Sequence, residues 1–230
     1  MYQTTFGPVA SAPKSVTEVA GALIIPDGFV MVFAIPVGPN KVVLIDCGND
    51  GPATAVKQAL AARSLTVEAV LVTHGHPDHV GGCNAIGAPV FTLQAEIPYV
   101  KGEKATQGPI PKLAGAHGLN VKVARGLSDG EVFTVGDKTI RVFAVPGHTL
   151  GSAVFLVDHV LYFGDAAGAG KDGKVIGPPA IFSDDVPQGV ASLHALAARL
   201  KADPALEITT FAFSHSAAMP ANLDLLAAVE

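Results

Sequence analysis

Cysteine is scarce in this chain, in which Cys47 and Cys83 are the only two. Two cysteines do not make the framework of disulfides that holds many small secreted domains together. We interpret both as small packing residues, with a redox or regulatory role as the alternative. The N-terminus lacks a charged segment followed by an apolar one, so we expect no signal peptide and a cytoplasmic location. A mature secreted form cut from a longer precursor would look the same.

Positive charge and long apolar runs are lacking as well. The formal net charge is −5, and Lys and Arg form no cluster, which gives nucleic-acid binding little electrostatic support. The best candidate for a membrane span is 19–37, but Pro26-Asp27-Gly28 breaks it into two strands and a turn. We therefore expect neither a nucleic acid nor a membrane as a partner. The apolar hairpin could be core or an interface between copies, so the oligomeric state stays open.

Apolar residues are abundant and occur in short segments. They make up 49% of the 230 residues, enough for a sizeable core, and we expect a single domain over 1–230. In each half of the chain strands cluster and a helix follows, which two packed sheets with helices outside would explain. We expect strands at 20–25, 30–37, 41–45, 69–72, 89–93, 121–124, 131–135, 139–145, 153–157, 160–163 and 208–213, and helices at 52–63, 80–86, 94–99, 190–201 and 222–229.

The most informative segment is Thr73-His74-Gly75-His76-Pro77-Asp78-His79, which follows the buried strand expected at 69–72. Burying three imidazoles and a carboxylate together costs free energy unless something binds them. A divalent metal is the simplest partner, because neutral imidazole and carboxylate are common metal ligands. The alternative is a solvated polar loop. The place of the segment, at the end of a strand and before a glycine pair, favours the metal site.

Three later polar residues also follow apolar strands. His148, Asp165 and His215 come after the segments 142–145, 161–163 and 208–213. Taken alone, they could be a turn histidine, a turn or cap residue, and a satisfied histidine near a helix start. Because the ends of several strands meet at one edge of a sheet pair, these side chains and the histidine run together predict one metal-binding site.

This pattern resembles the metallo-β-lactamase-fold hydrolase superfamily, which includes glyoxalase II and lactonases. The chain looks like a single-domain member, and the order and spacing match from about Val30 to the C-terminus. An Asp-Cys-Gly turn stands where the family has Asp-Thr-Gly, and Pro-Gly-His-Thr-Leu-Gly where it has Pro-Gly-His-Thr-Pro-Gly. The matching positions are Asp46-Cys47-Gly48, His74-x-His76-x-Asp78-His79, 146–151, Gly164-Asp165 and His215.

The resemblance implies an α+β fold, an αββα four-layer sandwich of two mixed β-sheets flanked by helices. It also implies two divalent metal ions between the upper edges of the sheets, with zinc as the first choice and iron or manganese as alternatives. Asp46 is expected to orient a ligand histidine and not to bind metal itself. The implied ligands are His74, His76 and His148 for the first ion, Asp78, His79 and His215 for the second, and Asp165 as the bridge.

The expected chemistry is hydrolysis, in which two ions share a water and lower its pKa to about 7. The metal-bridging hydroxide then attacks the carbonyl carbon of a carboxylic ester, lactone or thioester. Asp78 and Asp165 are the expected catalytic residues, with Asp78 as a proton carrier. A β-lactamase is less favoured, because true β-lactamases usually lack the bridging aspartate. The alternative from another class is a mononuclear iron oxidoreductase of the sulfur dioxygenase type.

The segment at about 94–120 shows little periodicity, and we expect it to form a flap that sets specificity for a small-molecule substrate. Tyr99 within it could cover the site or could simply pack, so a mobile lid and an ordinary surface loop both stay open. About fifteen residues follow His215, so we expect no C-terminal helical domain of the glyoxalase II type. Gly168 stands where lactonases often carry a tyrosine. Small neutral residues near Gly168 favour an uncharged ester, lactone or thioester over a phosphodiester.

Overall fold

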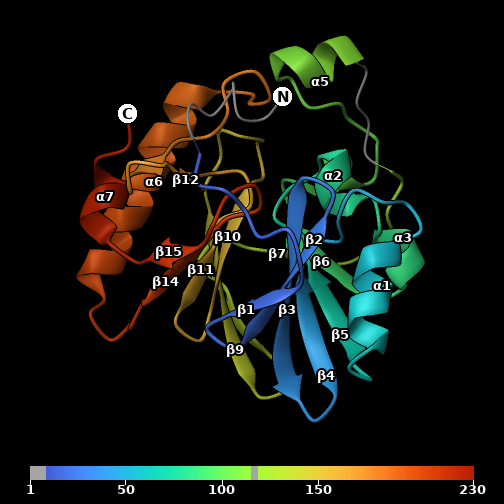
Figure 1. Cartoon of the computed structure of the whole chain (residues 1–230). Coiled ribbons are helices and arrows are strands. Elements are labelled where there is room, and N and C mark those ends of the chain that lie inside the picture. The colour runs from blue at the N-terminus through green and yellow to red at the C-terminus, as the bar shows by residue number, and fades with distance from the viewer. Residues whose placement is uncertain (1–8, 115–118) are drawn as a thin grey trace.

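Two β-sheets lie face to face, and helices cover the outer face of each (Figure 1). The computed structural model of the chain describes residues 9–114 and 119–230. The helices are α1 (Thr54–Ala61), α2 (Pro77–Val80), α3 (Cys83–Ile86), α4 (Ile97–Val100), α5 (Pro109–Ala114), α6 (Val186–Ala202) and α7 (Leu223–Ala227). The strands are β1 (Thr17–Val19), β2 (Ala22–Asp27), β3 (Val30–Gly38), β4 (Lys41–Ile45), β5 (Thr66–Leu71), β6 (Val90–Leu93), β7 (Val123–Leu127), β8 (Val132–Val135), β9 (Lys138–Ala144), β10 (Ala153–Val157), β11 (Val160–Tyr162), β12 (Gly168–Ala169), β13 (Val175–Ile176), β14 (Thr210–Ala212) and β15 (Met219–Pro220).

The first sheet has seven strands in the order in which they occur along the chain, β1 to β7. Strands β1 to β4 pair with antiparallel neighbours, whereas β4, β5, β6 and β7 pair in parallel. Parallel neighbours need a crossover connection, usually a helix, and α1 lies between β4 and β5. Since β4, β5 and β6 run in one direction, the loops that follow them lie at the same edge of this sheet.

The second sheet has six strands in the order β15-β14-β11-β10-β9-β8. Strand β10 is antiparallel to both β9 and β11, and β14 is parallel to β11. Strands β9, β11 and β14 therefore end at one edge. At the opposite edge tight turns join β3 to β4, β8 to β9 and β10 to β11, and Asn40, Gly136 and Asp158 adopt the positive φ that such turns require.

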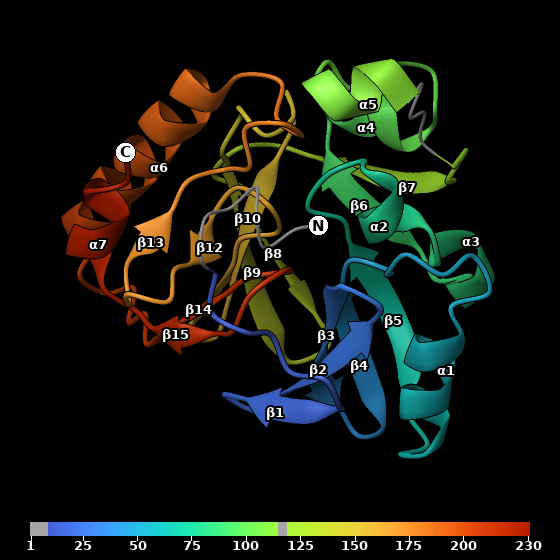
Figure 2. The same cartoon turned by 45° about the horizontal axis from the view of Figure 1, so that its top comes forward.

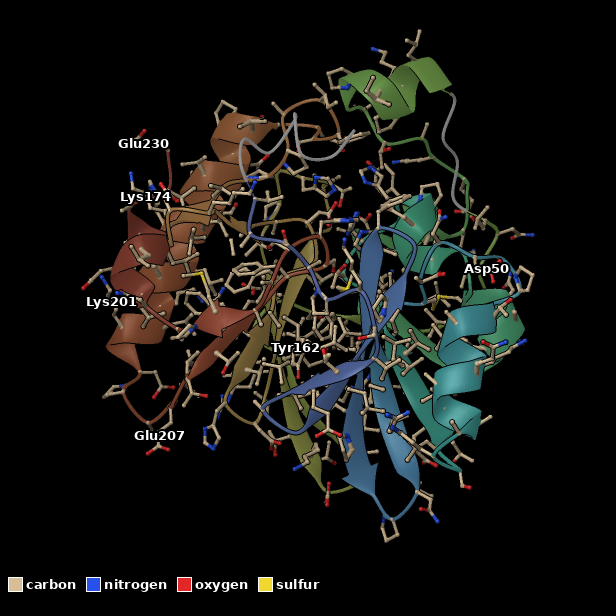
Figure 3. The ribbon with its side chains drawn as sticks, in the orientation of Figure 1. Asp50, Tyr162, Lys174, Lys201, Glu207 and Glu230 are labelled. Atoms are coloured by element: carbon tan, nitrogen blue, oxygen red, sulfur yellow. A yellow bond between two sulfur atoms is a disulfide. The ribbon has the colours of Figure 1, made fainter. Side chains whose placement is uncertain are left out.

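The apolar residues form three layers that alternate with the sheets. The middle layer contains side chains of both sheets, and Tyr162 lies in it with its ring 5.1 Å from that of Phe33 of the other sheet (Figure 3). On the outside of the first sheet, Val56 and Leu60 of α1 pack with β-sheet residues. On the outside of the second, the buried side of α6 packs with residues such as Phe163 and Phe211. The predicted αββα sandwich is confirmed.

The main departures from the predicted elements are short segments. The helix expected at 80–86 is two helices, α2 and α3, and α2 begins inside the histidine run, with Pro77 at its first turn. Strands β1, β12, β13 and β15 are too short to give a pattern in the sequence. The segment 94–120 was expected to be irregular beyond a first short helix, yet it carries α4 and also α5. Residues 115–118 of the expected flap lie outside the described residues.

The two cysteines form a disulfide, Cys47–Cys83, so their interpretation as separate packing residues was wrong. Cys47 lies in the turn after β4 and Cys83 starts α3, and backbone hydrogen bonds join the same segments, from Cys47 N to His79 O and from Gly82 N to Gly48 O. Disulfides are rare in cytosolic proteins. The disulfide therefore counts against the cytoplasmic expectation, which stays a prediction.

In the described part of the chain, no helix combines the length and the apolar character that a membrane span needs.

The disulfide should stabilise the protein by closing a loop between residues 36 positions apart. We expect reduction, or the pair Cys47→Ala and Cys83→Ala, to lower the free energy of unfolding by about 2–4 kcal/mol. Urea unfolding with and without reductant measures this change, and the double variant serves as the control that reductant should not affect. Thiol titration of the oxidised, unfolded protein should detect no free thiol. Two free thiols would contradict the assignment.

Candidate metal centre

The seven predicted ligands lie together at the edge of the sandwich where β5, β9, β11 and β14 end. The loop after β5 and helix α2 carry His74, His76, Asp78 and His79. The segments after β9, β11 and β14 carry His148, Asp165 and His215. Their side-chain donor atoms form two groups, and within each group the atoms lie within 4.8 Å of one another.

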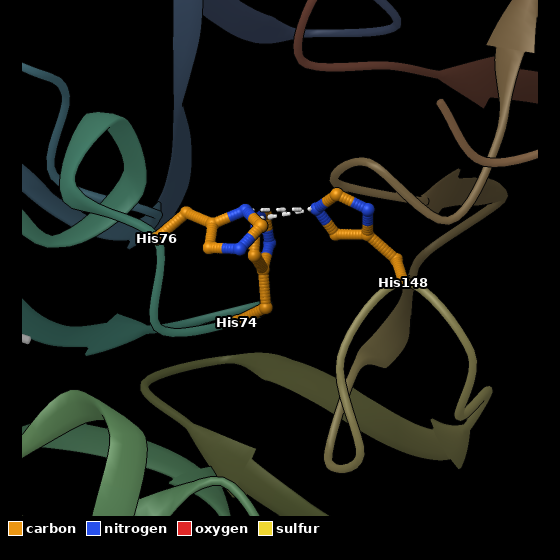
Figure 4. A group of neighbouring side chains, drawn as sticks. All are labelled: His74, His76 and His148. Carbon is orange, nitrogen blue, oxygen red and sulfur yellow. Dashed lines mark hydrogen bonds between the residues drawn. The ribbon is translucent and has the colours of Figure 1, made fainter. Parts of the chain in front are cut away.

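The tri-histidine group consists of His74, His76 and His148, and its rings converge on one point (Figure 4). Nε2 of His148 lies 3.1 Å from Nε2 of His74 and 3.0 Å from Nδ1 of His76. Burial lowers the pKa of His74 and of His148 well below the usual range and that of His76 to about 4. All three are therefore neutral near pH 7, which is the form in which imidazole binds a metal.

The mixed group consists of Asp78, His79, Asp165 and His215. Oδ1 of Asp165 lies 3.3 Å from Nε2 of His79 and 3.1 Å from Nε2 of His215, and Oδ2 of Asp78 lies 3.3 Å from the same nitrogen of His215. Burial opposes charge on each of these groups, but their mutual attraction is stronger. The two carboxylates raise the pKa of His215 to about 9, and the histidines lower the pKa of Asp78 to about 2.

Asp165 lies between the two groups. Its Oδ1 faces His79 and His215 of the mixed group, and its Oδ2 lies 3.6 Å from Nε2 of His148 in the tri-histidine group. The residue is 2% exposed. A carboxylate with one oxygen toward each group is placed as a bridging ligand would be.

The donor set suits divalent metal ions. Among the described residues, three buried donor or acceptor atoms of the site make no hydrogen bond of good geometry: Nε2 of His79 and both carboxylate oxygens of Asp165. Nε2 of His79 nevertheless lies 3.3 Å from Oδ1 of Asp165. Buried polar atoms without such partners cost free energy. Three neutral imidazoles suit zinc, and a set that mixes carboxylate and imidazole suits zinc, iron or manganese. The residues therefore fit the metal ions that the resemblance implies.

Side-chain or backbone groups from outside the two groups hold the rings of four histidines by Nδ1, and one of these contacts is that of His74 with Oγ1 of Thr73, at 3.1 Å. Nδ1 of His79 lies 2.7 Å from Oδ2 of Asp46, Nδ1 of His148 lies 2.9 Å from Oγ of Ser183, and Nδ1 of His215 lies 2.8 Å from the carbonyl oxygen of Phe29. Each of these contacts leaves Nε2 directed at the site, the arrangement usual for metal-binding histidines.

Asp46 contacts His79 from outside the two groups, and its expected role in orienting a ligand histidine stays a prediction. It is fully buried, and its carboxylate also accepts hydrogen bonds from the backbone N–H (2.7 Å) and the hydroxyl (2.8 Å) of Thr73. Ser183 was missed, because the sequence suggests only a helix cap at 183–185, and Asp185 is the residue that caps α6. Nothing in the sequence connects Ser183 with His148, since 35 residues separate them.

The flap packs against the loop of the histidine run and against the segment before α6. Tyr99 of α4 is 8% exposed, and a Cβ at Gly75 would lie 3.0 Å from its Cβ, so Tyr99 packs directly on the loop of the histidine run. Further along, the backbone N–H groups of Gln107 and Gly108 donate to Oδ1 of Asp184, at 2.6 and 2.9 Å. Figure 2 shows α4 and α5 on the same side of the molecule as α2. The lid role of Tyr99 stays a prediction.

Comparison with known sequences gives two results. The family model of the metallo-beta-lactamase superfamily matches residues 26–210. The chain is similar to the hydroxyacylglutathione hydrolase of Shewanella sp. (strain ANA-3), 33% identical over 126 residues that cover 54% of this chain and 44% of that protein. It is also similar to the hydroxyacylglutathione hydrolase of Aeromonas salmonicida (strain A449), 32% identical over 155 residues, 67% of this chain and 53% of that protein. The chain thus spans about half the length of these relatives.

Solved structures share the fold. A subclass B3 metallo-beta-lactamase of Bradyrhizobium japonicum superposes with a TM-score of 0.66 at 20% identity, covering 94% of this chain and 81% of that one. An archaeal metallo-beta-lactamase superfamily protein from Sulfolobus tokodaii gives a TM-score of 0.61 at 22% identity, covering 91% and 84%. At these identities the likeness concerns the fold alone.

The position of Asp165 leads to a prediction about metal content. We expect Asp165→Asn to bind at least one divalent ion fewer per chain, because an amide has neither the charge nor the second anionic oxygen that both groups face. Elemental analysis of the purified, zinc-loaded protein measures this stoichiometry. Asp172→Asn, which removes an exposed carboxylate, is the control and should keep the full content. An unchanged metal content in Asp165→Asn would argue against the ligand assignment.

Proposed function

Because the chain belongs to the metallo-beta-lactamase superfamily, we propose that it is a metal-dependent hydrolase that cleaves a thioester, ester or lactone with two divalent ions. The observation that carries the proposal is Asp165, whose two oxygens face two separate groups of ligands. A site for one metal would not need a buried carboxylate shared in this way. The mononuclear iron alternative, which uses fewer ligands, leaves the second group unexplained.

The residues divide the work as follows. One ion would be held by the tri-histidine group, His74, His76 and His148. The other would be held by Asp78, His79 and His215, and Asp165 would bind both ions. When bound, the ions supply Lewis acidity for a carbonyl oxygen and lower the pKa of a water molecule. Asp46, Ser183 and the carbonyl of Phe29 keep three imidazoles oriented, so that their Nε2 atoms need no rearrangement.

Asp78 is the group placed to carry a proton. Its carboxylate lies at the site but is less enclosed than Asp165, with 12% of its side chain exposed against 1%. Asp165 is held between the groups and has less freedom to exchange a proton with solvent. We therefore assign the handling of the reaction's proton to Asp78 and a holding role to Asp165.

The substrate class is inferred from the wall beside the mixed group. On this side the neighbours of Asp165 and His215 are small or apolar residues, namely Val9, Ala167, Gly168 and Ser216. None of these four neighbours carries a positive charge that would favour a phosphodiester, so the proposed substrate is an uncharged ester, lactone or thioester. The names of the relatives, hydroxyacylglutathione hydrolases, support a thioester among the candidates. A small molecule is accordingly the proposed substrate.

Removal of metal should abolish hydrolysis, because none of the proposed steps proceeds without the ions. Protein treated with a chelator and verified metal-free is assayed against thioesters, lactones, esters, β-lactams and phosphodiesters, before and after addition of zinc or manganese. We expect turnover of an uncharged acyl substrate to disappear and to return with two ions per chain. Full hydrolysis by the metal-free protein would overturn the proposal. A single iron per chain with thiol-dependent oxygen uptake would favour the dioxygenase instead.

A further inference from the structure

Glu96 is a buried carboxylate that belongs to neither metal-binding group. It follows β6, directly before α4, and its exposed fraction is 0%. Its Oε1 accepts a hydrogen bond from the backbone N–H of Gly75 at 2.7 Å. Its Oε2 accepts from the backbone N–H of Gly151 at 2.8 Å and from the hydroxyl of Thr149 at 3.0 Å. Burial raises the pKa of Glu96 to about 7, and these three hydrogen bonds act in the opposite direction.

The three donors come from two segments that are far apart in the sequence. Gly75 lies between His74 and His76, and Thr149 directly follows His148. A single side chain therefore joins the two segments that carry every histidine of the tri-histidine group. Asp46 supports the site from another side: it holds His79 of the mixed group and also Thr73, whose hydroxyl lies 3.1 Å from Nδ1 of His74. In the described part of the chain, its carboxylate makes no hydrogen bond or ion pair with the segment of His148.

Both segments approach Glu96 and its helix closely, and at Gly151 a side chain would collide with the backbone of Glu96. A Cβ at Gly151 would lie 2.4 Å from the backbone nitrogen of Glu96 and 2.7 Å from its Oε2. A Cβ at Gly75 would lie 3.0 Å from the backbone nitrogen of Val100. The N–H of each glycine donates to a different oxygen of Glu96. Close packing and hydrogen bonds therefore both fix the position of Glu96 between the two segments.

We infer that Glu96 is a positioning residue for the tri-histidine group: it sets the separation of the two segments at which the three imidazole nitrogens converge. The inference rests on the proposed function, in which that group holds one of two ions. Glu96 touches no reacting atom in this role. It acts through the backbone on either side of the histidines, and its loss should weaken one metal site and spare the other.

Cobalt titration can measure the two sites separately, because Co²⁺ has visible absorption bands that report its ligands and Zn²⁺, with a filled d shell, has none. The full chain is made metal-free and titrated with Co²⁺ as wild type, Glu96→Ala and Glu96→Gln. Single-site reference spectra come from His148→Ala, which disables the tri-histidine group, and Asp78→Ala, which disables the mixed group.

We expect Glu96→Ala to bind Co²⁺ at the tri-histidine group about 10- to 100-fold more weakly than wild type. Its spectrum at one equivalent should match that of His148→Ala. Glu96→Gln keeps the size of the side chain and one acceptor, but its amide N–H faces a donor, so its affinity should fall between the other two. The order wild type, Gln, Ala is what a positioning role requires.

Asp27→Ala is the matched control for a merely structural effect. Asp27 is also a buried carboxylate that accepts two backbone N–H groups, from Asn49 and Asp50, at 2.7 and 2.9 Å. Its loss should lower the thermal midpoint without changing the affinity or the spectrum of either site. If Asp27→Ala lowered the affinity of the tri-histidine group as much as Glu96→Ala does, general destabilisation would be the cause and the inference would be overturned.

Two further outcomes are decisive. Equal affinity of wild type, Glu96→Gln and Glu96→Ala at the tri-histidine group would overturn the inference, as would equal weakening of both sites in the Glu96 variants. Binding of only one Co²⁺ by the wild type would instead overturn the two-metal proposal. In that case the ratio of variant to wild-type affinity at the tri-histidine group still decides the role of Glu96.

Discussion

The direction of six strands is the constraint on which this molecule depends. Strands β4, β5 and β6 of one sheet end where β9, β11 and β14 of the other also end. Each is followed by a residue of the site or of its support: Asp46, the histidine run, Glu96, His148, Asp165 and His215. Parallel neighbours need crossovers, and the crossovers place helices on the outside. The four layers and the converging side chains are therefore two consequences of one choice of strand directions.

Charge divides the site into unlike halves. The tri-histidine group is neutral, because burial keeps its imidazoles unprotonated. The mixed group contains two carboxylates whose negative charge raises the pKa of both of its histidines. Two further buried carboxylates lie behind the site: Glu96 joins the two segments of the tri-histidine group, and Asp46 contacts His79 and also Thr73 beside His74. Buried polar networks of this kind favour one arrangement when every member has a partner.

The sequence was informative where patterns are local. The strands at 41–45 and 153–157 agree at both ends, because each is a short apolar run between turn residues. The seven proposed ligands could be picked out because the segments that carry them follow such runs, and the structure brings their side chains together. By contrast, β12, β13 and β15 have two residues each, and their pairing depends on tertiary contacts that no local pattern encodes.

The same reason explains what was missed at the site. The disulfide needs the turn after β4 to lie against α3, and the hydrogen bond of Ser183 needs the segment before α6 to lie against His148. In the sequence, Glu96 is one polar residue of the expected flap. Only the folded chain shows that its carboxylate lies between the backbone N–H groups of Gly75 and Gly151. These contacts join distant segments, and no motif or strand-end pattern marks which residues make them, so they follow only from the folded structure.

The tight turns at the opposite edge of the sandwich have a practical consequence. The turns at 39–40, 136–137 and 158–159 lie where β4, β9 and β11 begin, a full strand length from every ligand. A tag, a surface tether or a fused domain introduced there would leave the edge with the proposed metal site uncovered. The protein could therefore be immobilised through these turns, which are separated from the proposed site by the length of the strands.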